Sequence, residues 1–265
     1  MNRVVKLFVA LAAVLCLLMG SVAMAEIKVE LNVFAAASLT ESLTKISELY
    51  KEVQPDVTLT FNFDSSGTLE TQIESGAAAD LFISAAKKQM DALEEGGYLL
   101  EGTRKDVLNN KVVLIVPEGS TLSLNSFEDV AGDAVKLVAL GNSDVPVGQY
   151  AQEVFTTLAS WDQVLAKASL GANVKEVLTQ VASGAVDCGV VYATDALAAK
   201  GVTIVGEAPE GSHKPVVYPG AVLRDSSNGE AARAFLDYLT TPDAVAVFEA
   251  VGFTMSSAPE ADPTT

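Results

Sequence analysis

Two serines occur where a predicted strand gives way to a predicted helix, and this arrangement can bind an anion. Ser38 follows the apolar residues 28–34, and Ser66 follows residues 57–63, in which apolar and polar side chains alternate. The first backbone N–H groups of a helix have no partner within the helix, and the helix dipole places partial positive charge there. Together with a serine hydroxyl, they form a site suited to an oxyanion. Alternatively, Ser38 only caps its own helix and pairs with Glu41 in a capping box.

The two serines are more informative as a pair than singly. The helix after Ser38 is predicted over residues 39–53 from apolar side chains spaced three and four apart, and a shorter helix after Ser66 ends at Gly76. The carboxyl ends of neighbouring parallel strands meet at one edge of a sheet, where open α/β sheets bind ligands. We therefore expect both serines to face one site.

Strands and helices continue to alternate along the chain, which predicts an α/β fold. Further strands are expected at residues 79–84, 111–117, 136–140, 188–192 and 202–205. Pro146 is expected at the first position of a helix, and Asn173 is expected to cap the next one. Residues 214–223 contain two prolines, which favours an edge strand or a crossover strand. Two helices, at residues 230–239 and 242–250, are expected to end the fold.

An internal similarity favours two lobes of related winding. Residues 75–80 and 183–187 each combine a helix stop at Ser-Gly with an aspartate turn, and an apolar strand follows each. The alternative is that glycine stops and aspartate turns are ordinary punctuation. The polar segment 103–110 is a candidate crossover between the lobes.

Residues 1–25 have the pattern of a secretory signal peptide. Arg3 and Lys6 precede an apolar stretch at residues 7–19, and Ala23-Met24-Ala25 is a small-x-small cleavage signal. We therefore expect cleavage after Ala25 and an exported protein, periplasmic or held in the cell envelope. Residues 256–265 are polar and proline-containing, and are expected to be a disordered tail.

The composition excludes several classes of partner. Removal of Arg3 and Lys6 leaves 15 of the 17 basic residues against all 34 acidic ones, so the net charge changes from −17 to −19. Such a surface repels nucleic acid and anionic membranes. After cleavage Cys188 is the only cysteine, so no intramolecular disulfide is expected. An anion must then be attracted by local dipoles and not by overall charge.

The sequence lacks the usual signs of an enzyme. A Ser-His-Asp hydrolase would have to use His213, the only histidine, and no Gly-x-Ser-x-Gly elbow is present. There is also no phosphate-binding glycine-rich lysine loop and no cluster of metal ligands. Paired carboxylates stay open, because acidic residues are plentiful and no pair stands out. We expect no catalytic residues and no cofactor.

Six segments in order resemble the periplasmic molybdate-binding proteins of ABC importers, which belong to the type II periplasmic-binding-protein superfamily. They are VFAAASLT at 33–40, SSGTL at 65–69, ADLFISA at 79–85, VPVGQYA at 145–151, VVYATDA at 190–196 and VGF at 251–253. The resemblance covers the whole chain after the signal peptide. It implies a two-lobed Venus-flytrap α/β fold, with a mostly parallel sheet flanked by helices in each lobe and the ligand in the cleft between them. The lobe boundaries that follow are 26–109 and 194–255 for lobe I, and 110–193 for lobe II.

The resemblance also implies a ligand set. The hydroxyls of Ser38 and Ser66 match donors from one lobe, and the backbone N–H groups of Val147 and Val174 and the Tyr192 hydroxyl match donors from the other. Molybdenum would be held as an oxyanion, with no direct bond between protein and metal. Asp64 departs from the family pattern, since a carboxylate beside Ser65 would repel an anion unless it points away.

The function implied is capture of molybdate, and of tungstate, by a monomer that delivers it to the permease and ATPase subunits of an ABC importer. A donor-only site suits an anion that carries no proton, whereas hydrogen phosphate would leave its proton without an acceptor. Two alternatives stay open. One is a receptor of the same fold for sulfate, phosphate or an organic acid, and the other is an exported enzyme on a similar fold.

Overall fold

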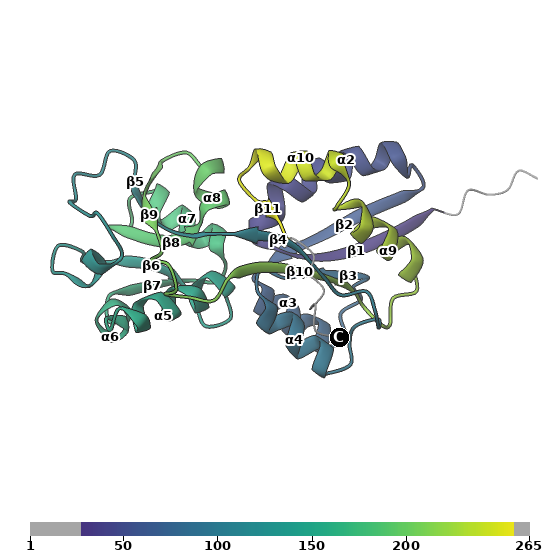
Figure 1. Cartoon of the computed structure of the whole chain (residues 1–265), viewed down its shortest axis with the longest axis horizontal. Helices are drawn as coiled ribbons and strands as arrows, with labels where there is room; N and C mark the ends of the chain where they lie inside the picture. The colour runs from purple at the N-terminus through teal and green to yellow at the C-terminus, as the bar shows by residue number, and fades with distance from the viewer. Residues whose placement is uncertain (1–27, 257–265) are drawn as a thin grey trace, which may run out of the picture.

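The computed structural model describes residues 28–256, which form two lobes that lie side by side (Figure 1). The expected signal peptide, and the expected tail beyond Ser256, lie outside the described residues. Each lobe contains one sheet with helices on both faces, as the α/β pattern of the sequence predicts. Both sheets are mixed and not mostly parallel, however, because β10 (Val216–Val222) pairs antiparallel in the first sheet and β5 (Val112–Pro117) in the second. The two-lobed α/β fold is as expected.

The first lobe is built on a six-stranded sheet with the order β11-β4-β10-β3-β1-β2. Helices α2, α9 and α10 cover one face, and α3 and α4 cover the other (Figure 1). The strands are β1 (Val29–Ala36), β2 (Val57–Asp64), β3 (Leu81–Ile83), β4 (Lys105–Asn110), β10 (Val216–Val222) and β11 (Thr254–Met255). The helices are α2 (Thr40–Val53), α3 (Ser66–Glu74), α4 (Lys87–Glu95), α9 (Gly229–Tyr238) and α10 (Pro242–Ala250).

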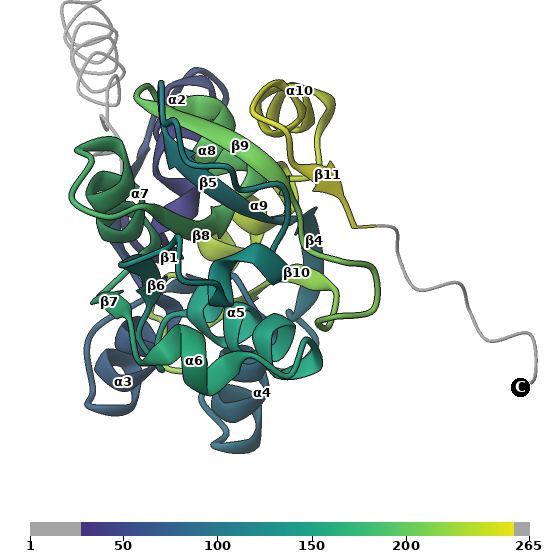
Figure 2. The ribbon, with the colours of Figure 1, turned by 90° about the vertical axis from the view of Figure 1, so that its left-hand side faces the viewer.

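The second lobe is built on a five-stranded sheet with the order β7-β6-β8-β5-β9. Its strands are β5 (Val112–Pro117), β6 (Val138–Gly141), β7 (Ala168–Gly171), β8 (Cys188–Tyr192) and β9 (Val202–Glu207). Its helices are α5 (Pro146–Thr157), α6 (Trp161–Leu165), α7 (Val174–Ala182) and α8 (Ala193–Ala198), with a short 3-10 turn at Glu128–Ala131. Figure 2 looks along the molecule from this lobe and shows α5 and α6 on the same side as α3 and α4 of the first lobe.

The two lobes repeat one arrangement of strands. In the first lobe β1 is parallel to both β2 and β3, and in the second β6 is parallel to both β7 and β8. The aspartates of the internal similarity also have equivalent contacts. Asp80 accepts the backbone N–H of Asn32 at 2.8 Å, and Asp187 accepts that of Leu137 at 2.9 Å. The similarity therefore reflects a repeated structural unit.

The expected course of the chain between the lobes needs three corrections. The crossover lies at the end of segment 103–110 and not along it, because β4 pairs with β10 and β11 inside the first sheet and only Lys111 separates it from β5 of the second sheet. The second lobe does not end at residue 193, because β9 pairs with β5 and the chain returns to the first sheet only at β10. Finally, of the two alternatives for residues 214–223, the crossover is right and the edge strand is wrong, since the chain returns from the second lobe at β10 and this strand lies between β4 and β3. The register shifts at Pro219, where the missing N–H can be tolerated.

Candidate functional site

Ser38 lies in a 3-10 turn (η1, Ala37–Leu39) that follows β1 and precedes α2, and it does not cap the helix. The expected capping box with Glu41 is therefore wrong, because the extra turn moves the serine away from the cap position. No side chain caps α2, and the Ser38 hydroxyl lies 2.9 Å from the hydroxyl of Tyr218 on β10. Ser38 therefore turns toward the interior between the lobes.

Ser66 is the first residue of α3, and the capping is done by its neighbour. The Ser65 hydroxyl accepts the N–H of Thr68 at 3.2 Å. Ser66 is fully buried, and its hydroxyl oxygen accepts the N–H of Ala85 at 3.0 Å. Since a hydroxyl that accepts one bond still has its own proton to donate, Ser66 can donate to a ligand.

Two helix starts of the second lobe present backbone donors. Val147 is the second residue of α5, after Pro146, and Val174 is the first residue of α7. The Asn173 side chain caps α7 as predicted, by accepting the N–H of Glu176 at 3.1 Å. The N–H groups of Val147 and Val174 belong to first turns, where a helix has no internal acceptors, so they are available to an anion.

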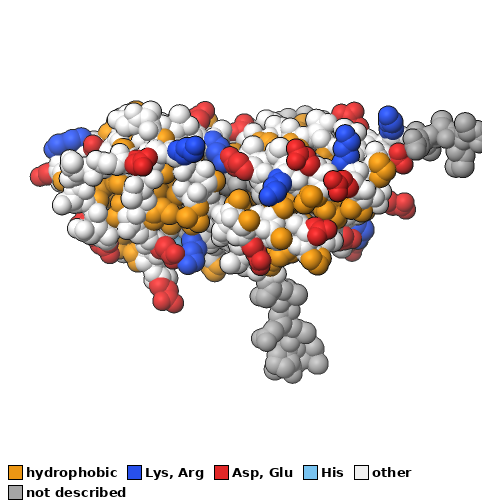
Figure 3. Space-filling view, turned by 90° about the horizontal axis from the view of Figure 1, so that it is seen from above, with side chains coloured by type: hydrophobic (Ala, Val, Ile, Leu, Met, Phe, Trp, Pro, Cys, Tyr) orange, Lys and Arg blue, Asp and Glu red, His pale blue; other side chains and the backbone are white. Residues whose placement is uncertain are grey.

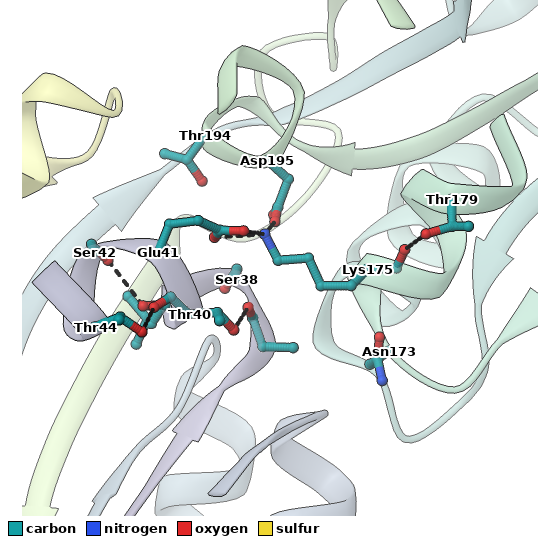
Figure 4. Close-up of polar contacts among 12 residues, drawn as sticks. Ser38, Thr40, Glu41, Ser42, Thr44, Asn173, Lys175, Thr179, Thr194 and Asp195 are labelled. Atoms are coloured by element: carbon teal, nitrogen blue, oxygen red, sulfur yellow. Dashed lines mark hydrogen bonds and ion pairs between the residues drawn. The ribbon is translucent and has the colours of Figure 1, made fainter. Parts of the chain in front are cut away.

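Contacts across the lobes bring these helix starts together. The N–H of Gly67 donates to the Asp144 carbonyl at 3.1 Å, which joins the start of α3 to the loop before α5. The Asn173 side chain donates to Asp64 at 3.3 Å, and η1 contacts α7. Figure 4 shows Ser38 on one side of the interface and Asn173 and Lys175, at the start of α7, on the other. The four helix starts thus meet at the interface between the lobes.

The Asp64 carboxylate already accepts hydrogen bonds from neighbouring groups. It accepts the backbone N–H of Ser65 at 2.7 Å as well as the Asn173 amide of the other lobe. A carboxylate that already accepts two hydrogen bonds is stabilised where it lies. Asp64 therefore joins the lobes.

Tyr192 ends β8 and places a hydroxyl in the same region. Its side chain is 2% exposed, and its ring packs edge-on against Tyr218 with 5.8 Å between centroids. Burial raises its pKa well above the usual value, so the hydroxyl stays protonated and can donate. Within the described residues this hydroxyl has no hydrogen-bond partner. A buried donor of this kind costs about 1–3 kcal/mol unless an acceptor is supplied, and an anion oxygen would supply one.

The site is shielded from solvent. Exposure is 5% for Ser38, 0% for Ser66 and Val147, 4% for Val174 and 2% for Tyr192. Charge–dipole interactions are stronger where water is excluded, so neutral donors suffice to hold a charged ligand there. The structure therefore brings all five predicted residues to one interlobe region.

The sequence did not point to the hydroxyl network behind Ser38. Tyr218 bonds both Ser38 and the Asn110 side chain, and Asn110 also bonds Thr194 of α8. Tyr218 lies on the strand between two prolines, and Asn110 ends the polar strand β4. Neither position has a local pattern that indicates a site, because Ser38, Asn110 and Tyr218 are far apart in sequence and meet only when the first lobe has folded.

A cluster of charged side chains also escaped sequence analysis. Lys175, in the first turn of α7, lies 2.8 Å from Glu41 of the other lobe and 2.9 Å from Asp195 of α8 (Figure 4). Burial lowers the pKa of Lys175, but the carboxylates of Asp195 and Glu41 have the larger combined effect and raise this pKa above its usual value. Burial raises the pKa of Asp195, and Lys175 counteracts this effect. The Glu41–Lys175 pair connects the lobes at the edge of the site.

Replacing Glu41 by glutamine is expected to weaken ligand binding only about two- to fivefold, because the pair is partly exposed and such pairs contribute little. Since this pair forms across the lobes, the loss should shrink as ionic strength rises. Calorimetric titration with the ligand at low and at high salt measures this loss of affinity. Asp237→Asn is the matched control, as it breaks the Lys105–Asp237 pair inside the first lobe. Equal effects of the two substitutions would contradict a role in closure.

Among residues 28–256, no group of three or more His, Cys, Asp or Glu side chains is arranged to hold a metal ion. No helix in that range has the length and apolar character needed to cross a membrane.

A two-lobed α/β protein with donor groups from both lobes buried at the interface is a receptor for a small solute. Residues 31–254 match the family described as bacterial extracellular solute-binding protein, and the chain belongs to this family. It is 40% identical over 230 residues to the putative ABC transporter substrate-binding lipoprotein YvgL of Bacillus subtilis, covering 86% of this chain and 88% of that protein.

Two further proteins are similar over most of the chain. The molybdate-binding protein ModA of Haemophilus influenzae is 38% identical over 230 residues, covering 84% of this chain and 89% of ModA. The solved structure of the Azotobacter vinelandii periplasmic molybdate-binding protein superposes with a TM-score of 0.77 at 25% identity, covering 86% of this chain and 100% of that one.

Proposed function

We propose that this protein captures molybdate outside the cytoplasm and delivers it to an ABC importer. The relatives named above include a molybdate-binding protein and an ABC transporter substrate-binding protein. The observation that carries the proposal is a buried set of neutral donors, from both lobes, at one place. Molybdate is bound by the hydroxyls of Ser38, Ser66 and Tyr192 and by the backbone N–H groups of Val147 and Val174.

The chemistry of this donor set suits molybdate. Molybdate is a fully deprotonated dianion near neutral pH, so each oxygen can accept hydrogen bonds and none needs an acceptor. Hydrogen phosphate carries a proton that the two backbone N–H groups cannot accept, so a hydroxyl would have to accept it, and an unmet donor in a buried site is costly. The Asp64 carboxylate already accepts bonds from Ser65 and Asn173.

The protein needs neither a cationic side chain to attract the anion nor a side chain that bonds directly to molybdenum. The chain has 34 acidic and 17 basic residues, and Figure 3 shows acidic side chains distributed over both lobes. Attraction therefore comes from helix starts and hydroxyls, and molybdenum is held only through its oxygens. Tungstate has the same charge and shape and is expected to bind as well.

The ligand acts by favouring the closed arrangement of the lobes. Gly67–Asp144, Asp64–Asn173 and Glu41–Lys175 all join one lobe to the other and form only when the lobes are together. An anion that bonds to both lobes shifts the population toward this closed form. A monomer in this form is what the permease of the importer recognises. The protein performs no catalysis and needs no cofactor.

Thermal unfolding with added anions tests the proposal. Molybdate and tungstate are expected to raise the midpoint clearly at micromolar concentration, because a ligand that binds only the folded state stabilises it. Sulfate should act only at much higher concentration, and hydrogen phosphate least. Larger stabilisation by sulfate or phosphate than by molybdate would overturn the assignment.

His213→Ala is the control for the location of the site. His213 lines an open groove together with Lys88 and Glu153, away from the five donors. The molybdate-induced rise in midpoint should be the same as in the unmodified protein. A large loss in this variant would mean that the anion binds elsewhere.

A further inference from the structure

The orientation of the Asn110 side chain is fixed at the point where the chain leaves the first lobe. Its Oδ1 accepts the N–H of Lys111 at 2.8 Å, which identifies the other end of the amide as Nδ2. Nδ2 donates to the Thr194 hydroxyl at 2.9 Å and to the Tyr218 hydroxyl at 3.2 Å. Asn110 can therefore only donate to Tyr218.

The hydrogen bond between Tyr218 and Ser38 also has a fixed direction, because Asn110 can only donate to Tyr218. Tyr218 is fully buried, and of the two groups bonded to its hydroxyl within the described residues, only the Ser38 oxygen can accept. Burial also raises the pKa of Tyr218 well above its usual value, so the phenol keeps its proton. Tyr218 therefore donates to Ser38 across 2.9 Å. Ser38 accepts, and its own proton is left for a ligand.

We propose that Asn110 and Tyr218 are positioning residues that hold the Ser38 hydroxyl as a hydrogen-bond donor toward an oxyanion that carries no proton. The proposal rests on the proposed function, because it concerns the same site. If Ser38 instead accepted a proton from the ligand, it would donate to Tyr218. The buried Tyr218 proton would then have no acceptor, which is unfavourable. The relay thus disfavours an anion that presents its proton to Ser38, as hydrogen phosphate can.

Asn110→Asp tests the relay because it keeps the shape of the side chain and reverses its hydrogen bonding. A carboxylate accepts from Tyr218, Tyr218 then accepts from Ser38, and Ser38 presents a lone pair to the ligand. Molybdate affinity, measured by calorimetry, is expected to fall about 100-fold, since the added charge and the reversed hydroxyl act together.

The same substitution in a Tyr218→Phe background separates the two causes. Without the Tyr218 hydroxyl no relay exists, so Asn110→Asp should cost only about tenfold, through its charge alone. Equal losses in the two backgrounds would overturn the relay. Tyr150→Phe is the matched control, because Tyr150 is another buried tyrosine near Tyr192 whose hydroxyl contacts the Pro215 carbonyl and not Ser38.

Tyr218→Phe alone gives a second test that does not depend on how well the aspartate variant folds. It should lower molybdate and sulfate affinity in parallel, about three- to tenfold, and reduce the ratio of molybdate to hydrogen-phosphate affinity by at least about fivefold. A purely structural defect would weaken all three anions equally and would overturn the relay. If the unmodified protein did not bind molybdate, the proposed function itself would fail.

Discussion

Replacing Gly148 by alanine is expected to lower molybdate affinity by at least about 100-fold, because overpacking against backbone forces a helix to move. Gly148 follows Val147 in the first turn of α5. A Cβ atom there would lie 2.2 Å from the Gly141 carbonyl oxygen and 2.7 Å from that of Asn142. Both atoms are backbone, so no side chain can rotate away. The start of α5 must shift from β6 and carry the Val147 N–H out of position.

This outcome is opposite to the usual effect of the substitution. Alanine in a helix is ordinarily more stable than glycine by about 1 kcal/mol. Here the unfolding midpoint should fall even without ligand, because the overlap lies within one lobe and exists whether the lobes are open or closed. Calorimetric titration measures the affinity, and thermal unfolding without anion measures the strain.

Gly229→Ala is the matched control for Gly148→Ala. Gly229 begins α9, and an added Cβ would meet only the Leu100 side chain, at an ordinary 3.7 Å. Molybdate affinity should be unchanged and stability equal or slightly higher. If the Gly148→Ala variant bound molybdate as tightly as this control, the start of α5 would not hold the anion.

Ser66→Ala is expected to weaken molybdate binding by about 1.5–3 kcal/mol, roughly 10- to 150-fold, the usual contribution of a hydrogen bond to a charged group. Ser66 is fully buried at the start of α3, and its oxygen is already used by the Ala85 N–H. The hydroxyl proton is therefore the part available to the ligand. The substitution also leaves the Ala85 N–H without its acceptor, so a small loss of stability should accompany the loss of affinity.

Ser42→Ala separates the two effects of removing a buried serine. Ser42 is 2% exposed in the first turn of α2, and its hydroxyl donates to the Leu39 carbonyl. This variant should lose a little stability and keep its affinity for molybdate. Calorimetry showing unchanged affinity for Ser66→Ala as well would remove Ser66 from the ligand set.

The sequence alone predicted most of the elements, because their signals are local. Strict alternation predicted the strand that became β2, and a continuous apolar run predicted β5. Pro146 and Asn173 predicted the starts of α5 and α7, since a proline at the first helical position and an asparagine cap act within a single turn. Those starts and the serine-bearing turns predicted where backbone donors and hydroxyls occur, whereas Val147, Val174 and Tyr192 were assigned to the site only through the family resemblance.

Where those local signals failed, contacts between residues distant in sequence determined the structure. The capping pattern around Ser38 was present, yet the hydroxyl bonds Tyr218, which is 180 residues away in the chain. The prolines around β10 favoured an edge strand or a crossover strand, and β10 is a crossover strand that lies inside the sheet, where the register shift at Pro219 accommodates the missing donor. Both outcomes depend on partners that sequence spacing does not reveal.

Features that depend on neighbouring residues can be predicted from the sequence, whereas features that depend on distant residues cannot. Helix caps, strand alternation and turn residues act over a few residues, so the sequence by itself determined the two related α/β units and the donors at their ends. The return of the chain at β10, the Glu41–Lys175 pair and the direction of the hydrogen bonds from Asn110 to Ser38 depend on groups far apart in sequence. Packing of the lobes against each other decided the Glu41–Lys175 pair, and packing within the first lobe decided the other two.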